Sequence, residues 1–474
     1  MSLLALGAIL EGRHDYRIID GNLVSDPLRS LDDAIASSGA CTLGITVMPG
    51  PQLQNAVPIS RAIKQKHPHV RIVWGGYFPT QHYEACVTDE AVNFVVRGHG
   101  EYAFASLVDL LESGGENFRM PGISFFDEDL AKIIDGGLAP LPHPRELPDL
   151  FPYHRVEVER YVRPTFLGSR TLPHHSSYGC PFFCNFCAVV NMVDGRWKAQ
   201  SAEQTARVAE YLVKTYGVNA MEFDDNNFFT HEDRIAEFCE RIGRLNIRWW
   251  GEARIDTMLK FSERTWSLMR AAGLKMVFLG AESGSDETLA RMNKGGKASI
   301  EKTLAIAERM KAYNIIPEMS FVLGNPPDPE KDARQTIGFI RKVKQINPAT
   351  EIIMYMYTPV PLAGELYERA RAAGFNFPET LDGWISPEWL EFSQRRSVHV
   401  PWMKDPIRRQ IQDFQWVLNA FFPTTTDIHM RKWKRLLLRG AAAWRYHTGL
   451  YRNPLELKAL HRIASYQRPE TSGF

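Results

Sequence analysis

Short apolar runs recur along the first part of the chain and alternate with amphipathic stretches that have helical spacing. The runs are RIID at 17–20, CTLGITVM at 41–48, VRIVWGG at 70–76 and VNFVVRGHGE at 92–101. Short runs rich in Val and Ile predict buried strands, and their alternation with helices is typical of an α/β fold. The pattern therefore predicts a doubly wound domain at the N-terminus.

A second series of alternating strands and helices begins near Tyr161 and ends near Pro361. The expected strands are 172–179, 218–224, 247–253, 275–281, 316–323 and 351–357, each followed by a helical pattern. Six such units predict a partial or complete parallel barrel.

A proline-rich stretch separates the two series. It is LAPLPHPRELPDLFPYHR at 138–155, and it follows an expected hairpin at 121–137. Such composition is typical of a linker. We divide the chain into an α/β domain at 1–137, a linker at 138–160, a barrel at 161–361 and a helical region rich in Trp and Arg at 362–474.

Composition indicates a globular protein, because 44% of the 474 residues are hydrophobic and 23% are charged. A formal net charge of +1 argues against a surface covered by nucleic acid. The first residues lack the basic segment of a signal peptide, and no run reaches the ~18 apolar residues of a membrane span. We expect a cytoplasmic protein.

Three of the six cysteines lie within eight residues, at Cys180, Cys184 and Cys187. Six cysteines are too few for a disulfide scaffold, and their clustering indicates a metal site. A closed zinc site needs a fourth ligand. His174 or His175 could supply it, but the sequence has no second pair of Cys or His residues at the spacing usual for zinc. Three thiolates on an iron–sulfur cluster instead leave one iron open to a small molecule.

CxxxCxxC with an aromatic residue before its last cysteine, placed after the first strand of a βα barrel, resembles the radical S-adenosylmethionine (SAM) enzymes. The resemblance implies a [4Fe-4S] cluster on Cys180, Cys184 and Cys187, with SAM on the open iron. It also implies reductive cleavage of SAM to a 5'-deoxyadenosyl radical, and hence an electron donor such as flavodoxin or ferredoxin. Phe186 would pack near the adenine.

Three later segments resemble the strand ends that line the SAM site in this family. They are MEFDDNNF at 221–228, GEARID at 251–256 and FLGAESGS at 278–285. The resemblance assigns Asp225 to the SAM amino group and Arg254 to its carboxylate. It places Glu282 on the ribose hydroxyls, with Ser283 beside it. For each acid, the alternative is an ion pair at the barrel rim.

The first domain resembles the cobalamin-binding domain that precedes some radical SAM barrels, through VWGGYFPT at 73–80 and VVRGHGEYAFASLVDLL at 95–111. The resemblance implies cobalamin beside the strand ends, where Gly75 and Gly76 let the backbone approach a bulky ligand. The other cobalamin candidates are Thr46, Met48 and Gly98. A nucleotide site, or an ordinary domain with tight turns, is the alternative.

The chain departs from that family at three points. There is no DxHxxG motif, and Gly98-His99-Gly100-Glu101 stands where the family reads Gly-Glu-Gly-Glu, so we expect His99 to be a surface loop residue. The chain also starts inside the helix LLALGAILEGR at 3–13, so we expect the first strand of the sheet to be missing.

The stretch from 428 to 468 has ten Lys or Arg residues against one acid, Glu456, with Trp and Leu interleaved. A solvated helical cap on the barrel, a peripheral contact with an anionic membrane, and an RNA contact all fit this composition. A membrane contact would favour a hydrophobic small-molecule substrate. We expect no nucleic-acid partner.

Together these resemblances imply a cobalamin-dependent radical SAM methyltransferase acting on an unactivated carbon or phosphorus centre through the 5'-deoxyadenosyl radical and methylcobalamin. An oxidative cyclase or ring-rearranging enzyme of tetrapyrrole, hopanoid or other natural-product biosynthesis is the alternative. An RNA methylthiotransferase would need three more cysteines in the first domain, where only Cys41 and Cys86 occur. A metal-stabilised sensor or RNA-binding protein is the non-enzyme alternative.

Overall fold

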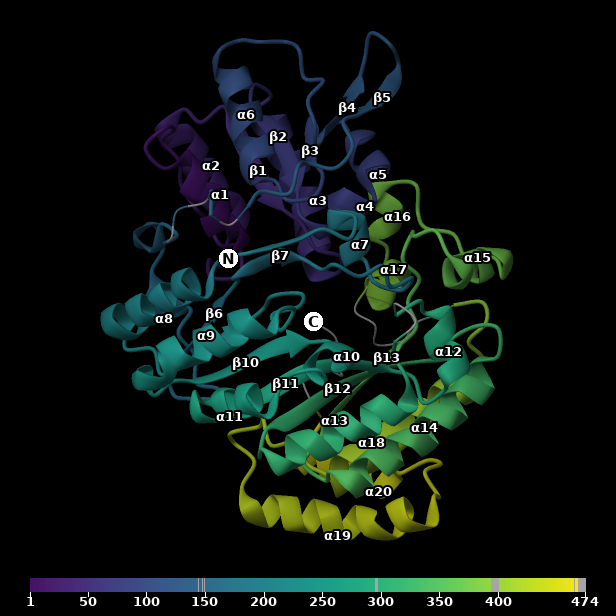
Figure 1. The fold of residues 1–474 in the computed structure, drawn as a ribbon. Helices are drawn as coiled ribbons and strands as arrows, with labels where there is room; N and C mark the ends of the chain where they lie inside the picture. The colour runs from purple at the N-terminus through teal and green to yellow at the C-terminus, as the bar shows by residue number, and fades with distance from the viewer. Residues whose placement is uncertain are drawn as a thin grey trace.

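The computed structural model describes residues 1–143, 145–146, 148, 150–294, 297–393, 400–463 and 465–467. Figure 1 shows an N-terminal sheet at the top, a larger sheet in the middle and the last two helices, Lys432–Thr448 and Leu455–Ile463, along the bottom. None of the helices among the described residues is long and apolar enough to span a bilayer.

The N-terminal sheet has the strand order β1-β2-β3-β4-β5. Its strands are β1 (Thr42–Thr46), β2 (Arg71–Gly75), β3 (Phe94–Val96), β4 (Ile123–Asp127) and β5 (Lys132–Asp135). The first three are parallel, and the expected hairpin at 121–137 is confirmed as the antiparallel pair β4 and β5. Helices of this part are α1 (Ser2–Leu10), α2 (Pro27–Ser38), α3 (Pro51–Lys66), α4 (Tyr77–Gln81), α5 (Tyr83–Val87) and α6 (Glu101–Glu112).

The strand expected at 17–20 is not formed. The RIID segment has no ladder partner, because β1 pairs only with β2 in the described sheet. Ile18 instead packs against the core of the larger sheet. An apolar run becomes a strand only where a neighbouring strand accepts its hydrogen bonds, and here hydrophobic burial occurred without pairing.

The larger sheet has six parallel strands in the order β13-β12-β11-β10-β9-β6. They are β6 (Thr171–His174), β9 (Ala220–Phe223), β10 (Arg248–Ala253), β11 (Leu274–Glu282), β12 (Ile316–Leu323) and β13 (Glu351–Met356). Its helices are α8 (Ala202–Tyr216), α9 (Glu232–Ile242), α10 (Ile255–Met258), α11 (Glu263–Ala271), α12 (Asp286–Arg291), α13 (Ile300–Ala312) and α14 (Pro329–Ile346). Since β6 and β13 form its two edges, the sheet is a partial barrel.

The single strand expected at 172–179 is two strands. The chain turns after β6, and β7 (Ser177–Gly179) pairs antiparallel with β8 (Trp197–Ala199) in a separate hairpin. Helix α7 (Val189–Val193) lies inside that hairpin, together with the three clustered cysteines. The linker carries two single turns, at Tyr153–Arg155 and Val158–Arg160.

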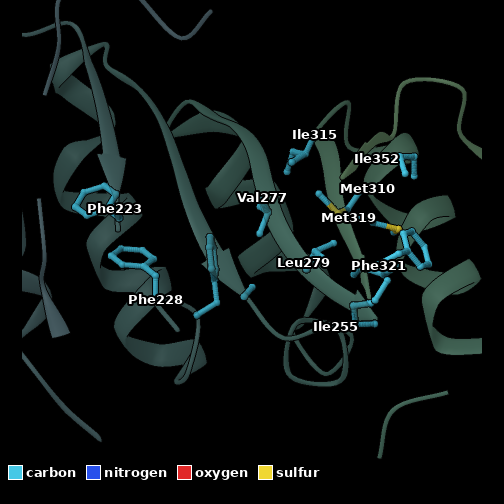
Figure 2. Close-up of a cluster of buried hydrophobic side chains, with 14 of the residues drawn as sticks. Phe223, Phe228, Ile255, Val277, Leu279, Met310, Ile315, Met319, Phe321 and Ile352 are labelled. Carbon is cyan, nitrogen blue, oxygen red and sulfur yellow. The ribbon is translucent and has the colours of Figure 1, made fainter. Parts of the chain in front are cut away.

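Aromatic side chains fill the space between β9, β10 and α9. Trp249 is fully buried, stacks on Phe229 at 5.8 Å between ring centroids, and meets Phe223 and Phe238 edge to face. Figure 2 shows how this core continues as aliphatic and Met side chains along β11 and β12.

The C-terminal helices divide between the two sheets. They are α15 (Glu365–Ala372), α16 (Leu381–Trp384), α17 (Pro387–Ser393), α18 (Asp405–Phe421), α19 (Lys432–Thr448) and α20 (Leu455–Ile463). Trp384 of α16 joins the N-terminal core against Phe78 and His82, whereas α18 packs on α14 of the barrel. Burial in this aromatic pocket lowers the pKa of His82 to about 3. The C-terminal helices therefore pack against both the N-terminal sheet and the barrel.

Trp249→Ala should lower the free energy of unfolding by about 3–5 kcal/mol, because it leaves a large cavity among aromatic rings. Trp444→Ala is the matched control: this side chain is 51% exposed on α19, and its loss should change stability by less than about 0.5 kcal/mol. Urea denaturation followed by circular dichroism checks both. Equal effects of the two substitutions would contradict the packing described.

Candidate active site

The cysteine loop starts at a glycine that no other residue could replace without strain. Gly179 ends β7 with φ of 80°, and a Cβ there would lie 2.2 Å from the carbonyl oxygen of Arg196. Both the left-handed backbone and the missing side chain are needed for the chain to leave the strand while β8 returns beside it. The sequence Gly179-Cys180 thus places the first thiol at the mouth of the hairpin.

The loop rests on the segment after α12. The backbone N–H of Asn185 donates to the carbonyl of Met292 at 3.1 Å, and its side chain donates to the carbonyl of Arg291 at 3.0 Å. Asn293 returns a hydrogen bond to the carbonyl of Phe183 at 3.1 Å. Phe186 lies half-buried against Met292. These contacts hold the cysteine loop over the carboxyl ends of the barrel strands.

Two cations lie next to the thiol of Cys184. Nη1 of Arg254 is 3.5 Å from its Sγ, and the guanidinium stacks on Phe182 at 3.8 Å. Burial raises the pKa of the Cys184 thiol, while Lys294 and Arg254 act in the opposite direction. Burial also raises the pKa of Cys187 to about 12. The cations favour the thiolate that a metal requires.

Arg254 and Glu282 are already partnered within the protein. Arg254 donates to Asp256 at 3.0 Å and to the carbonyl of Lys294 at 2.7 Å. Glu282 has φ of 63° and pairs with Lys294 at 2.8 Å, with both side chains buried. The structure thus brings both predicted SAM residues to the cysteine loop, with Lys294 between them.

Asp225 is fully buried and accepts hydrogen bonds from the chain that precedes the cysteine loop. It accepts from the backbone N–H of Ser176 at 3.0 Å, from the Ser176 hydroxyl at 2.8 Å and from the Ser177 hydroxyl. Arg234 of α9 donates to the same Ser176 hydroxyl at 2.6 Å. In this structure Asp225 holds the turn between β6 and β7, and its contact with SAM stays a prediction.

Ser283 lies behind the barrel rim. Its buried hydroxyl donates to Asp332 of α14 at 3.3 Å, and Asp332 also accepts from the backbone of Gly324 and Asn325. Asp332 therefore links the ends of β11 and β12 to α14. The predicted proximity of Ser283 to SAM is likewise not tested.

Acidic side chains share the barrel interior. Glu252 on β10 is half-buried; burial, reinforced by Asp224, Asp225 and Glu318, raises its pKa to about 8. Burial, with Glu222 and Asp225 nearby, raises the pKa of Asp224 to about 7. Both carboxyls hold a proton near neutral pH far more than an exposed acid does.

The predicted cobalamin residues lie at the carboxyl edge of the N-terminal sheet. Thr46 and Gly75 are register partners at the ends of β1 and β2, and Gly76 follows with φ of 96°. A Cβ on Gly76 would lie 2.8 Å from the hydroxyl of Thr46. Met48 is 44% exposed just beyond β1. This edge thus combines bare backbone with one exposed apolar side chain.

That edge packs directly on the cysteine hairpin. Helix α4, which follows Gly76, contacts α7, and Asn191 of α7 donates to Gln81 of α4 at 3.4 Å. A Cβ on Gly98 would lie 3.2 Å from the carbonyl oxygen of Met192. His99 lies in a loop, as expected, but its side chain is only 18% exposed and its ring is 4.7 Å from that of Tyr178 on β7, so it is half-buried rather than at the surface. The strand ends of both sheets therefore meet at the hairpin.

Two families match the chain at these two places. Residues 1–108 match the B12 binding domain, and residues 175–340 match the Radical SAM superfamily. Together the matched segments make up more than half of the chain. It is a cobalamin-dependent radical SAM enzyme.

Known relatives match more than half of the length of this radical SAM enzyme. An uncharacterised methyltransferase of Pyrococcus horikoshii is 26% identical over 72% of this chain and 73% of its own length. An anaerobic magnesium-protoporphyrin IX monomethyl ester cyclase of Synechocystis is 28% identical over 60% of this chain but only 54% of its own length. The cobalamin-dependent enzyme OxsB, solved with aqua-cobalamin and SAM bound, has 17% identity and a TM-score of 0.72 over 98% of this chain and 73% of its own. The OxsB likeness shows the fold.

The cofactors of this radical SAM enzyme are a [4Fe-4S] cluster, SAM and cobalamin, and its partners are a small-molecule substrate and a reductant. Among the described residues no group of three or more His, Cys, Asp or Glu side chains is arranged to hold a single metal ion. A four-iron cluster is larger than one ion and spreads its thiolates farther apart. The donor set fits it: three thiols on one loop, with Arg254 and Lys294 to balance negative charge.

Sequence reasoning missed Lys294, Arg234 and Asn227. Lys294 follows α12 and carries no motif, and Arg234 is one of many arginines on helices. Asn227 is fully buried, and its side chain acts against the burial that raises the pKa of the Cys180 thiol. It stands in the quoted MEFDDNNF segment, which was the available signal.

Cys180→Ala, Cys184→Ala and Cys187→Ala should each reduce iron to near background after anaerobic reconstitution and abolish SAM cleavage. Cys41→Ala, Cys86→Ala and Cys239→Ala should retain about four irons per chain, as a [4Fe-4S] cluster requires. Cys41 is exposed, whereas Cys86 and Cys239 lie in hydrophobic cores. Iron analysis and the charge-transfer absorbance measure the effect. Iron loss in the second group would contradict the assignment.

Glu252→Gln should stabilise the protein increasingly as pH rises from about 5 to about 8.5. Because the folded state raises the pKa of Glu252 to about 8, wild-type stability falls as pH rises between the ordinary glutamate value and 8. The glutamine amide does not ionise, so the variant does not lose this stability as the pH rises. Thermal midpoints across this pH range measure it, with the exposed Glu203→Gln as control. A pH-independent difference would show that Glu252 is ionised in the fold.

Proposed function

We propose that this radical SAM enzyme transfers a methyl group to an unactivated carbon or phosphorus centre of a small molecule. The observation that carries the proposal is the packing of the Gly76 edge on the cysteine hairpin through α4 and α7. Two cofactors held on opposite sides of one hairpin would be close enough to act on a single substrate. The methyltransferase from Pyrococcus horikoshii supports the same reaction class.

In this proposal Cys180, Cys184 and Cys187 would hold the cluster, and SAM would bind to its open iron. Phe186 contacts the adenine, Arg254 the carboxylate, Asp225 the amino group, and Glu282 with Ser283 the ribose. Thr46, Met48, Gly75, Gly76 and Gly98 border cobalamin. When bound, these groups supply a carbon radical and a transferable methyl group.

The chain's own residues orient and shield that chemistry. Phe182 stacks on the face of the Arg254 guanidinium, and Asp256 accepts a hydrogen bond at its edge. These two contacts fix the guanidinium beside Cys184. Lys294 fixes the Glu282 carboxylate through a buried ion pair. Two buried and fixed polar groups next to the thiols pre-order the site before SAM arrives.

A second reaction, oxidative cyclisation or ring rearrangement, is favoured by one observation. The cyclase of Synechocystis shares 28% identity with 60% of this chain, although the chain spans about half of that enzyme. The same cofactor pair would serve it, and its product would have a new or rearranged ring and no added methyl group.

We also propose that the reductant is a flavodoxin or ferredoxin and that the enzyme works in the cytoplasm. The cluster must accept one electron for each radical formed, and small redox proteins deliver single electrons at low potential. A peripheral contact with a membrane, and with it a hydrophobic substrate, belongs to the same proposal.

The reaction is tested with SAM that carries a deuterated methyl group. Reduced holoenzyme, incubated with an extract of cells lacking the gene, should give a product with a deuterated methyl group, with S-adenosylhomocysteine and 5'-deoxyadenosine in equal amounts. One SAM supplies the methyl group and another the radical. Mass spectrometry measures the product and both nucleosides.

The Cys187→Ala enzyme is the control and should form no 5'-deoxyadenosine in the same extract. Formation of 5'-deoxyadenosine with an unlabelled product and no S-adenosylhomocysteine would replace methyl transfer with the cyclase alternative.

A further inference from the structure

Helix α19 has two apolar faces, and only one of them is covered. Leu438, Ala442 and Tyr446 are buried, with Tyr446 stacked on Phe421 of α18 at 4.4 Å. On the other face Trp433 is 57% exposed, Leu436 70%, Leu437 46% and Trp444 51%. We call these four residues the outer face. Their spacing puts them on one side of the helix.

The outer face lies at the edge of the molecule. Figure 1 shows α19 along the bottom, beyond α18 and far from the N-terminal sheet. Eight of the fifteen large apolar side chains exposed among the described residues fall between 428 and 463, including Leu450, Leu455 and Ile463. A monomeric protein rarely exposes so much apolar surface in one place without a partner.

Positive charge surrounds this apolar surface. Between 428 and 463 there are nine Lys or Arg residues and one acid, Glu456, which is ion-paired with Arg445. The exposed cations are Arg431, Lys432, Arg439, Arg452 and Arg462. Arg468, part of the basic stretch noted in the sequence, lies outside the described residues.

We infer that the outer face of α19 docks on an anionic lipid bilayer, with its Trp and Leu side chains in the interface and its cations on the headgroups. Trp and Leu on one face, flanked by Lys and Arg, is the pattern of helices that lie in a membrane surface. Trp is favoured there, since its ring is apolar and its N–H reaches water. This inference rests on the peripheral membrane contact named in the proposed function and assigns that contact to one surface; it does not depend on the methyl-transfer reaction.

Charge favours lipid over the other occupants. In a contact between two copies of this chain, the same basic surfaces would meet and repel each other. Nucleic acid would satisfy the cations but would leave the central Trp and Leu side chains without apolar contact. An anionic bilayer alone matches both the charge and the apolar stripe.

The test is flotation of the full-length holoenzyme with unilamellar vesicles, either phosphatidylcholine alone or phosphatidylcholine mixed with phosphatidylglycerol. The mixed vesicles should bind the protein more strongly, and added salt should weaken binding. The double variant Leu436→Asp/Leu437→Asp should lower the partition coefficient about tenfold or more. The matched control is Leu130→Asp, an exposed leucine of the β4–β5 turn, which should bind like wild type.

A second variant separates charge from apolar contact. Lys432→Glu/Arg439→Glu should reduce binding to the mixed vesicles while leaving binding to phosphatidylcholine unchanged. Iron content and circular dichroism identify any variant that has lost its fold. If the Leu436→Asp/Leu437→Asp variant is misfolded, the Lys432→Glu/Arg439→Glu variant, whose changes lie at the surface, tests the inference instead. SAM cleavage should stay the same in all correctly folded variants.

Three results would overturn the inference. The first is equal vesicle binding by wild type and both double variants. The second is a concentration-dependent dimer in analytical ultracentrifugation that Leu436→Asp abolishes, which would assign the outer face to a second copy. The third is tight binding of an RNA oligonucleotide without vesicle binding.

Discussion

A buried carboxylate determines where the cysteine hairpin begins. Asp225, at the end of β9, accepts hydrogen bonds from Ser176 and Ser177, and Arg234 of α9 closes the group from the other side. A buried carboxylate without these donors would be very costly, so few other arrangements of this turn are available to the chain. The direction of β7, and with it the position of all three thiols over the barrel rim, follows from this group.

The cysteine hairpin, fixed in this way, packs between the N-terminal sheet and the larger sheet. On one side Cys184 meets Arg254 from the end of β10, and on the other α7 meets α4 from the end of β2. Parallel strands deliver their loops to one edge, which is why both sheets present their carboxyl ends here. One short segment can therefore couple chemistry on two cofactors.

Charge is distributed unevenly around the cysteine hairpin. Arg254 and Lys294 lie at the rim beside the thiols, whereas Glu252 and Asp224 lie in the interior with raised pKa values. Cations beside the loop compensate an anionic cluster, and carboxyls that keep their protons avoid adding charge of the same sign nearby. At neutral pH Glu252 is therefore mostly protonated and Asp224 about half protonated, so these two carboxyls add less negative charge to the interior than exposed acids would.

The sequence alone determined the elements and the chemistry of the loop. Alternating apolar runs predicted the six barrel strands, and the spacing of Cys180, Cys184 and Cys187 predicted a three-thiolate metal site, because both signals are local. Only tertiary structure decided that RIID forms no strand, that 172–179 breaks in two, and that His99 packs on Tyr178. It also decided that Lys294 pairs with Glu282 and that one face of α19 stays uncovered. These outcomes depend on which distant residues arrive beside each segment, and no local pattern of side chains contains that information.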